Sequence, residues 1–272
     1  MYLSLNGQIL QPENACIPYA SEGLQYGYGL FETIKIYKGE MLFIKEHLER
    51  FQKGCQVLNI PIHYDINLIR KYCNQLISVN NIDFGALKIL YTKNKNIYHL
   101  CITTRQSPYI KEKYIKGFAL CFAASRKNPY ASLTYIKSNN YLENILEKQK
   151  SAEKNCEEAI FLNTNHQISE GTYTNIFFVK DDTIYTPSVN CGLLPGIMRS
   201  KVMDLIQRLR LPLKVGAYDP ASLLAADEIF VTNSLMDIMP VSQLEDIRFD
   251  LSNNPITQRL RSEFSKYYDS LK

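Results

Sequence analysis

A lysine and a glutamate stand out in this sequence because each one borders an apolar stretch. Lys137 lies in YIKSNN, between an apolar dipeptide and the expected start of a helix. Glu170 lies in HQISEGTYTNIFFV, just before the apolar run 176–179. The ordinary expectation is an exposed lysine and a solvated loop carboxylate. The functional alternatives are a partly desolvated amine that forms a Schiff base and a carboxylate that faces a buried cation.

Other positions could bind an anion. Gly196 and Ile197 in LLPGIMRS open a predicted helix, whose backbone N–H groups and dipole suit a phosphate. Arg50 in HLERF could be a bidentate phosphate ligand or a surface arginine. Thr232 and Ser234 are expected just past a strand end, where loop hydroxyls often bind ligands. The plain alternatives are a simple helix start and a simple turn.

Taken together, these residues describe a site for pyridoxal 5'-phosphate. Lys137 would meet the aldehyde, the helix start and Arg50 would hold the phosphate, and Glu170 would face the pyridine nitrogen. A carboxylate there keeps the nitrogen protonated, because neighbouring opposite charges stabilise each other's charged forms. A protein that merely binds small molecules, without catalysis, would not need the whole set.

The composition is that of an ordinary globular protein. The chain has 272 residues, 46% hydrophobic and 21% charged, with a net charge of +4. This balance is too mild to suggest a nucleic-acid or membrane partner. The seven cysteines contain no C-x-x-C pair and the four histidines are scattered, so we expect no metal site. No signal peptide or long apolar stretch is evident, which predicts a cytoplasmic protein.

The elements that must position these residues follow from periodicity. A hairpin is expected around the turn Lys38-Gly39, followed by helices within 45–60 and 66–79 and strands at 86–92 and 97–104. Residues 1–108 would form an N-terminal domain, 109–116 a linker, and 117–272 a C-terminal cofactor-binding domain. Asn140 and Glu143 match a capping box for a helix marked by Leu142, Ile145, Leu146 and Gln149.

The ordered segments resemble the class IV, or fold-type IV, pyridoxal-phosphate enzymes. YGYGLFET, HLERF, IKSNNYL, EEAIFLNTNHQISEGTYTNIFFV, GIMR and DEIFVTNSLMDIMPV match the family's segments in order along some two hundred residues. The resemblance implies an α/β (α+β) protein, with a small N-terminal domain, a larger C-terminal domain with a curled sheet, and a homodimer. It assigns Lys137, Arg50, Glu170, Gly196, Ile197 and Ser234 to the cofactor, and also Tyr141, for which a place in a helix core is the alternative.

Within that family, NSLMDIMPV is more similar to the 4-amino-4-deoxychorismate lyases than to the branched-chain or D-amino acid aminotransferases. The resemblance therefore favours the lyase, with an aminotransferase as the alternative. Tyr28 departs from the family pattern, which has Asp there, and Lys93 stands where an Arg is common. Both, together with Tyr109, are candidates for contact with a small-molecule substrate.

Overall fold

The structure, a computed structural model, describes residues 1–270, with side chains through Tyr268. The chain forms two compact units. Unit 1 comprises Met1–Pro108 and Ile136–Tyr141, and unit 2 comprises Tyr109–Tyr135 and Leu142–Lys272. Residues 271–272, part of the predicted C-terminal domain, lie outside the described residues. The short segment that carries Lys137 thus belongs to a different unit from the residues on either side of it.

The sheet of unit 1 runs in the order β2-β1-β6-β5-β3-β4, with antiparallel neighbours. The turn Lys38-Gly39 joins β3 to β4, and both residues have positive φ, as a two-residue hairpin turn requires. The strands are β1 (Leu3–Leu5), β2 (Gln8–Leu10), β3 (Gly29–Tyr37), β4 (Glu40–Met41), β5 (Phe84–Asn94) and β6 (Ile97–Arg105). The helices are α1 (Glu22–Gln25), α2 (Ile44–Val57) and α3 (Ile66–Asn80), with η1 at Pro12–Asn14.

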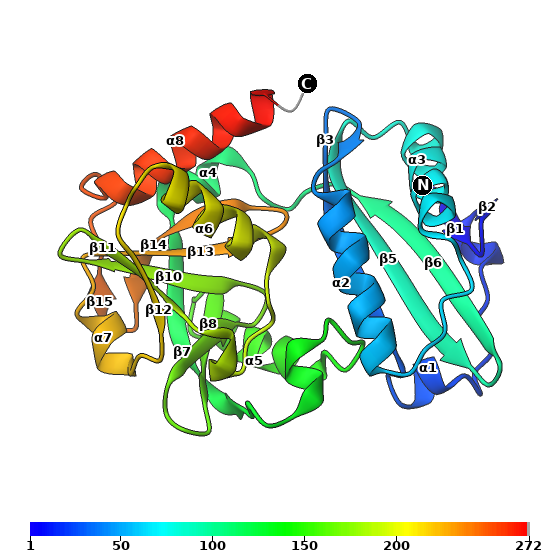
Figure 1. Ribbon diagram of the computed structural model, residues 1–272, viewed down its shortest axis with the longest axis horizontal. Helices are drawn as coiled ribbons and strands as arrows, with labels where there is room; N and C mark the ends of the chain where they lie inside the picture. Colours follow the sequence, from blue (N-terminus) through cyan, green and yellow to red (C-terminus); the bar gives the residue numbers. More distant parts are fainter. Residues whose placement is uncertain (271–272) are drawn as a thin grey trace. The chain divides into compact units, whose positions relative to one another are not determined.

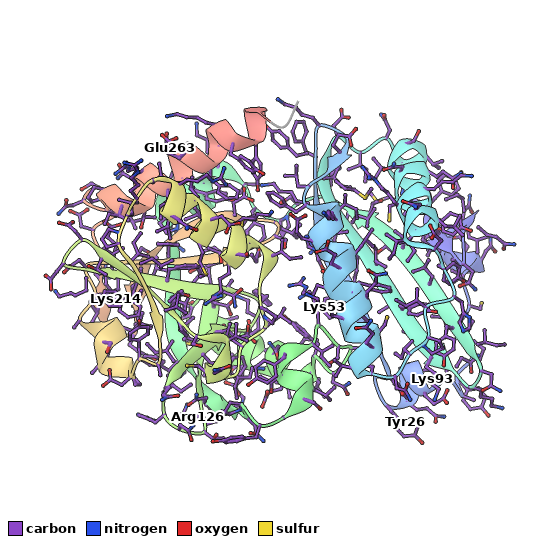
Figure 2. All side chains as sticks on the ribbon, viewed as in Figure 1. Tyr26, Lys53, Lys93, Arg126, Lys214 and Glu263 are labelled. Atoms are coloured by element: carbon purple, nitrogen blue, oxygen red, sulfur yellow. The ribbon has the colours of Figure 1, made fainter. Side chains whose placement is uncertain are left out.

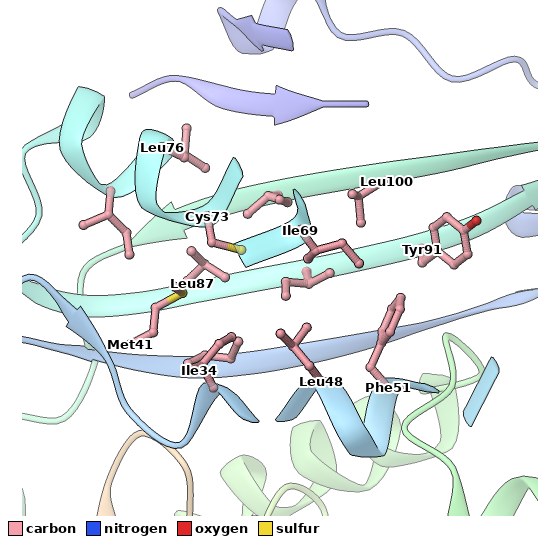
Figure 3. Close-up of a cluster of buried hydrophobic side chains, with 14 of the residues drawn as sticks. Ile34, Met41, Leu48, Phe51, Ile69, Cys73, Leu76, Leu87, Tyr91 and Leu100 are labelled. Carbon is pink, nitrogen blue, oxygen red and sulfur yellow. The ribbon is translucent and has the colours of Figure 1, made fainter. Parts of the chain in front are cut away.

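Helices α2 and α3 cover one face of this sheet, as Figures 1 and 3 show. Their apolar stripes supply Leu48 and Phe51 from α2 and Cys73 from α3, while β3 and β5 supply Ile34 and Leu87. All five side chains are buried. The apolar periodicity that predicts the two helices is therefore the pattern that builds the core of unit 1.

The sheet of unit 2 runs in the order β12-β11-β10-β13-β14-β7-β8-β9, and β15 pairs with β14. Register shifts at β7–β8, β8–β9 and β14–β7 mark irregularities that bend such a sheet. Its strands are β7 (Phe118–Lys127), β8 (Glu158–Asn163), β9 (Ile168–Gly171), β10 (Asn175–Lys180), β11 (Thr183–Pro187), β12 (Leu213–Gly216), β13 (Glu228–Asn233), β14 (Asp237–Leu244) and β15 (Ile247–Arg248).

Helices α6 and α8 contact each other and β13, whereas α5 packs against β7 and β8. The helices are α4 (Lys111–Lys116), α5 (Leu142–Glu153), α6 (Ile197–Arg208), α7 (Pro220–Leu224) and α8 (Pro255–Ser270), with short turns η2 (Ser132–Tyr135) and η3 (Val189–Cys191). Among the helices of residues 1–270, none has the length and apolar character to cross a bilayer.

The segment 109–116, for which the sequence suggests a linker, contains helix α4 and lies within unit 2. The helix is only six residues long, KEKYIK, so it is too short to display a helical period. It contacts β14. The whole of the expected linker therefore belongs to unit 2.

Helix α5 begins at Leu142, two residues after Asn140, whose side chain donates to the Gly27 carbonyl at 3.1 Å. The capping box of Asn140 and Glu143 stays a prediction. The residues facing the protein are polar: Asn144, Glu147 and Ser151. The residues facing outward are apolar: Leu142, Ile145 and Leu146, which are 66%, 47% and 45% exposed.

Candidate active site

The backbone of Lys137 is attached to strand β3. Its carbonyl accepts a hydrogen bond from Phe31 N at 2.9 Å, and Asn139 N donates to the Gly29 carbonyl at 3.0 Å. The Lys137 amine lies 4.5 Å from the centre of the Phe31 ring and 5.4 Å from the centre of the Tyr141 ring. Those two rings pack edge to face. The lysine is half-buried, and its carbonyl pairs with the backbone of β3.

Arg50 is held by a buried carboxylate from the same unit. Its Nε donates to Glu32 Oε1 at 2.8 Å and its Nη2 donates to Oε2 at 2.6 Å. His47, three residues earlier on α2, shares Glu32 through a 2.7 Å contact between Nδ1 and Oε2. Glu32 and His47 are each 1% exposed. Helical spacing thus places Arg50 and His47 on the face of α2 that meets β3.

The pKa values of Glu32 and His47 depend on each other and on the charge of Arg50. Burial by itself would raise the pKa of Glu32, but the charge and hydrogen bonds of Arg50, with help from His47, hold it at about 2. Burial lowers the pKa of His47, the charges of Arg50 and Lys137 lower it further, and Glu32 opposes them. His47 is therefore neutral at pH 7 and donates from Nδ1. Its Nε2 is buried with no hydrogen-bond partner among the described residues.

Replacing Glu32 by Gln should destabilise the protein in a pH-dependent way. Because folding depresses the Glu32 pKa from 4.5 to about 2, the ionised carboxylate adds about 3 kcal/mol above pH 4.5. This contribution disappears as the pH falls from 4.5 towards 2. Urea unfolding at several pH values should show a wild-type advantage at pH 7 that shrinks in this window. Glu49→Gln, at a half-exposed position of the same helix, should show little gap. A Glu32→Gln gap independent of pH would contradict this prediction.

Glu170, on β9 in unit 2, does not face open water. It is 8% exposed, and Oε2 accepts from Leu194 N at 3.0 Å and from Asn175 Nδ2 at 3.5 Å. Asn175 Nδ2 also donates to the Leu194 carbonyl at 3.0 Å. Asn175 therefore connects Glu170 to the chain that leads into α6.

The turn after Glu170 is fixed by a second carboxylate, Glu158 on β8. Glu158 is fully buried and accepts from Thr172 N at 2.9 Å, Tyr173 N at 3.2 Å and the Thr174 hydroxyl at 3.1 Å. Burial raises the pKa of Glu158, and the Thr172 hydroxyl, which also donates to it, acts in the opposite direction. This network holds the residues between Glu170 and β10.

The N-terminus of α6 offers uncapped backbone donors. Gly196 is the N-cap, and no side chain caps this 12-residue helix. A Cβ at Gly196 would collide with Asn175 Oδ1, so a larger residue would displace that side chain. Thr232 lies opposite Asn175 in the β10–β13 register, and its hydroxyl is buried without a partner among the described residues. Backbone N–H groups at Ile197 and an unpartnered hydroxyl nearby are typical of an anion site.

The structure separates the two hydroxyl residues expected past a strand end. Thr232 lies inside β13, whereas Ser234 lies in the turn between β13 and β14. Asn233 Oδ1 accepts from Leu235 N and Met236 N, both at 2.9 Å, so the turn is organised around the Asn233 side chain.

The three candidate substrate contacts have partners within their own units. Tyr28 donates to the Leu58 carbonyl at 2.8 Å, and the Lys93 amine lies 4.6 Å from the centre of the Tyr28 ring. Lys93, labelled in Figure 2, also approaches Glu22 Oε1 at 3.6 Å. Tyr109 accepts from Asn233 Nδ2 at 3.1 Å. Within residues 1–270, no cluster of His, Cys, Asp and Glu could hold a metal ion.

Comparison with known proteins identifies the family. The family model described as amino-transferase class IV matches residues 29–244. The chain is 26% identical to an aminodeoxychorismate lyase of Bacillus subtilis over 279 residues, covering 96% of this chain and 93% of the relative. It is 27% identical over 276 residues to a D-alanine aminotransferase of Staphylococcus epidermidis, covering 98% and 97%. Its structure resembles the branched-chain amino acid aminotransferase of Escherichia coli, with a TM-score of 0.91, 24% identity and coverage of 97% and 93%.

The residues present fit pyridoxal phosphate, the cofactor of this family. Within unit 1 there are an amine on a strand-bound backbone and an arginine. Within unit 2 there are a buried carboxylate and an uncapped helix N-terminus, with the Thr232 hydroxyl unpartnered among the described residues. An aldehyde, a pyridine nitrogen and a phosphate need these donor types. The predicted α/β fold and the recognised family are both confirmed. The chain belongs to the class IV aminotransferase family and is a pyridoxal-phosphate-dependent enzyme with the fold-type IV architecture.

Proposed function

We propose that this protein is a 4-amino-4-deoxychorismate lyase, which releases pyruvate and forms 4-aminobenzoate for folate synthesis. The observation that carries the proposal is the turn after β13, NSLMDIMPV, whose sequence is similar to that of the lyases. The Bacillus subtilis relative supports the same activity. Lys137, Arg50, Glu170, Gly196, Ile197 and Ser234 are the proposed cofactor-binding residues, together with Tyr141.

Cationic side chains near Lys137 also support an acidic substrate. The Lys88 amine on β5 lies 4.6 Å from the centre of the same Phe31 ring that Lys137 approaches. Burial lowers the pKa of Lys88, and the charge of Arg105 on β6 lowers it further. The lyase substrate has two carboxylates, whereas D-alanine and the branched-chain amino acids have one. A second cation near the lysine therefore suits the lyase substrate better.

In this proposal Lys137 moves the proton. When bound, the cofactor supplies an aldehyde for the substrate amine and a ring that accepts electrons. Lys137 removes the proton from the amine-bearing ring carbon, and Glu170 balances the positive charge on the pyridine nitrogen. The bond between the neighbouring carbon and the ether oxygen breaks, the ring becomes aromatic, and the proton returns to the enol carbon, giving pyruvate. Arg50 and the start of α6 hold the phosphate throughout.

An aminotransferase acting on D-amino or branched-chain amino acids is the alternative. The D-alanine aminotransferase relative, at 27% identity, supports it as directly as the lyase relative supports the first proposal. The same Lys137 would return the proton to the cofactor, and a keto acid would leave.

Product analysis distinguishes the lyase from the aminotransferase. The protein loaded with pyridoxal phosphate is incubated with 4-amino-4-deoxychorismate, generated from chorismate, and 4-aminobenzoate and pyruvate are followed. Equal release of both, absent with Lys137→Ala, is expected. A parallel incubation with D-alanine or L-leucine and 2-oxoglutarate tests for keto acid. Keto acid formation without release of 4-aminobenzoate would replace the lyase by the aminotransferase.

We also propose that the enzyme is a homodimer, as its family resemblance implies. The support within the chain is the outward apolar side of α5, since an unpaired row of leucine and isoleucine is unfavourable in water. Leu146→Glu should convert a dimer into a monomer in sedimentation analysis. Val79→Glu, at a similarly exposed apolar position on α3, should stay dimeric. A Leu146→Glu protein of unchanged mass would mean that α5 does not form the interface.

A further inference from the structure

The turn that carries Ser234 is supported from outside itself. Asn233–Asp237 joins β13 to β14, and inside it Asn233 Oδ1 accepts from Leu235 N and Met236 N. Asp237 adopts a left-handed conformation with φ of 62°, which is unfavourable for a residue with a side chain. A strained turn persists only where its surroundings hold it.

Tyrosine hydroxyls from two elements far apart in sequence supply that support. Tyr114, on α4, donates to the Met236 carbonyl at 2.9 Å. Tyr268, on α8, donates to Asp237 Oδ1 at 2.5 Å. Tyr109, in the chain before α4, accepts the 3.1 Å bond from the Asn233 side chain. All of these residues belong to unit 2.

The rings of both donating tyrosines pack against neighbouring side chains. The Tyr268 ring packs edge to face on Phe264 with centroids 5.1 Å apart, and the Arg261 guanidinium lies 5.3 Å from the centre of the Tyr114 ring. Burial, and then the charge of Asp237, raises the pKa of each phenol, so both keep the proton that they donate at any physiological pH. Helix α8 is therefore connected to the Ser234 turn by a buried, permanent donor.

We propose that Tyr114 and Tyr268 are positioning residues, whose hydroxyls fix turn 233–237 so that the Ser234 hydroxyl is presented to the cofactor phosphate. The inference rests on the proposed function only in placing Ser234 at the phosphate. Helices α4 and α8 then contribute to cofactor affinity without contacting the cofactor. Loss of either hydroxyl leaves the turn with more conformations, of which only a fraction bind phosphate, and apparent affinity falls by that fraction.

The test uses Tyr268→Phe and Tyr114→Phe, which remove only a hydroxyl. Pyridoxal phosphate is titrated into each apoprotein, and amide hydrogen exchange is followed across unit 2. We expect each variant to weaken cofactor affinity about tenfold and to speed exchange in 233–241. Turnover at saturating cofactor should stay within about twofold of the wild type, since a positioning residue changes occupancy rather than chemistry. Tyr218→Phe is the matched control, because it loses a hydroxyl bond to the Lys214 carbonyl elsewhere in unit 2 and should change neither measurement.

Ser234→Ala distinguishes the inference from the function on which it rests. Weaker affinity in Ser234→Ala, without faster exchange, supports the phosphate assignment. If that result holds but Tyr268→Phe and Tyr114→Phe bind normally, the positioning inference is overturned alone. If the Ser234→Ala protein also binds pyridoxal phosphate normally, the assignment of Ser234 to the phosphate is wrong, and the positioning inference that depends on it is wrong too. Exchange that rises throughout unit 2 would show a general structural role for the tyrosines, and would likewise overturn the inference. Two variants on separate helices keep the test decisive if one does not fold.

Discussion

Lys137→Ala should stop the reaction and the covalent attachment of the cofactor together. The lysine is the proposed site of attachment and the group that moves the proton, and loss of a general base alone typically costs about 10²–10⁴-fold in rate. Attachment is measured by borohydride reduction followed by peptide mass analysis, and the rate by product release. Because Lys137 lies against Phe31 and Tyr141 on a strand-bound backbone, its removal should leave unit 1 folded.

Lys88→Ala is the informative partner for that experiment. The Lys88 amine approaches the same Phe31 ring from β5, and the Lys88→Ala protein should still attach the cofactor covalently.

A small amine such as methylamine should restore part of the proton transfer in the Lys137→Ala protein, because the space left by the lysine side chain remains. Attachment mapped to another lysine in the Lys137→Ala protein would show that the assignment is wrong.

Glu170→Gln should have the second largest effect. Glutamine keeps an oxygen that can accept from Leu194 N, so the local geometry is retained while the charge is lost. Breaking a buried charge pair costs about 3 kcal/mol or more, which corresponds to about 10²-fold in rate if the pair exists in the transition state. Turnover at saturating cofactor is the measurement.

A cofactor analogue makes the Glu170 test specific. Pyridoxal phosphate methylated on the ring nitrogen carries a permanent positive charge, so it does not need a carboxylate to stay charged. It should restore much of the rate lost in Glu170→Gln if that loss reflects ring protonation. A loss of less than about threefold in Glu170→Gln, on the 10²-fold scale expected from a charge pair, would place Glu170 away from the ring nitrogen.

Much of unit 1 could be predicted because its signals are local. The Lys38-Gly39 turn, the apolar stripe of α2 and the alternation of β5 each depend on residues close in sequence. The short helix α4 gave no such signal, and its charges were typical of an exposed connection. Local patterns thus identified the elements but not how α4 packs against β14.

The sequence singled out candidate site residues whose type is unusual in its local context. It did not single out residues whose burial depends on contacts that are distant in sequence. Lys137 and Glu170 stood out because charge next to an apolar run is unusual. Glu158 and His47 did not, because a polar side chain at a strand start or on a helix is ordinarily exposed, whereas both are buried by contacts with other elements. The outward direction of the apolar side of α5 was equally unpredictable, since periodicity shows that an apolar stripe exists but not which way it faces.

The division of the chain also has a consequence for its inheritance. Unit 1 includes residues Ile136–Tyr141, while the residues before and after that segment belong to unit 2. A gene fragment that ends at Pro108 therefore encodes an N-terminal unit without Lys137, and one that continues to Tyr141 carries an unfinished piece of the other unit. No single cut yields the first unit both complete and free of residues from the second. A single crossover therefore cannot exchange unit 1 with its lysine for another domain without also moving residues 109–135 of unit 2.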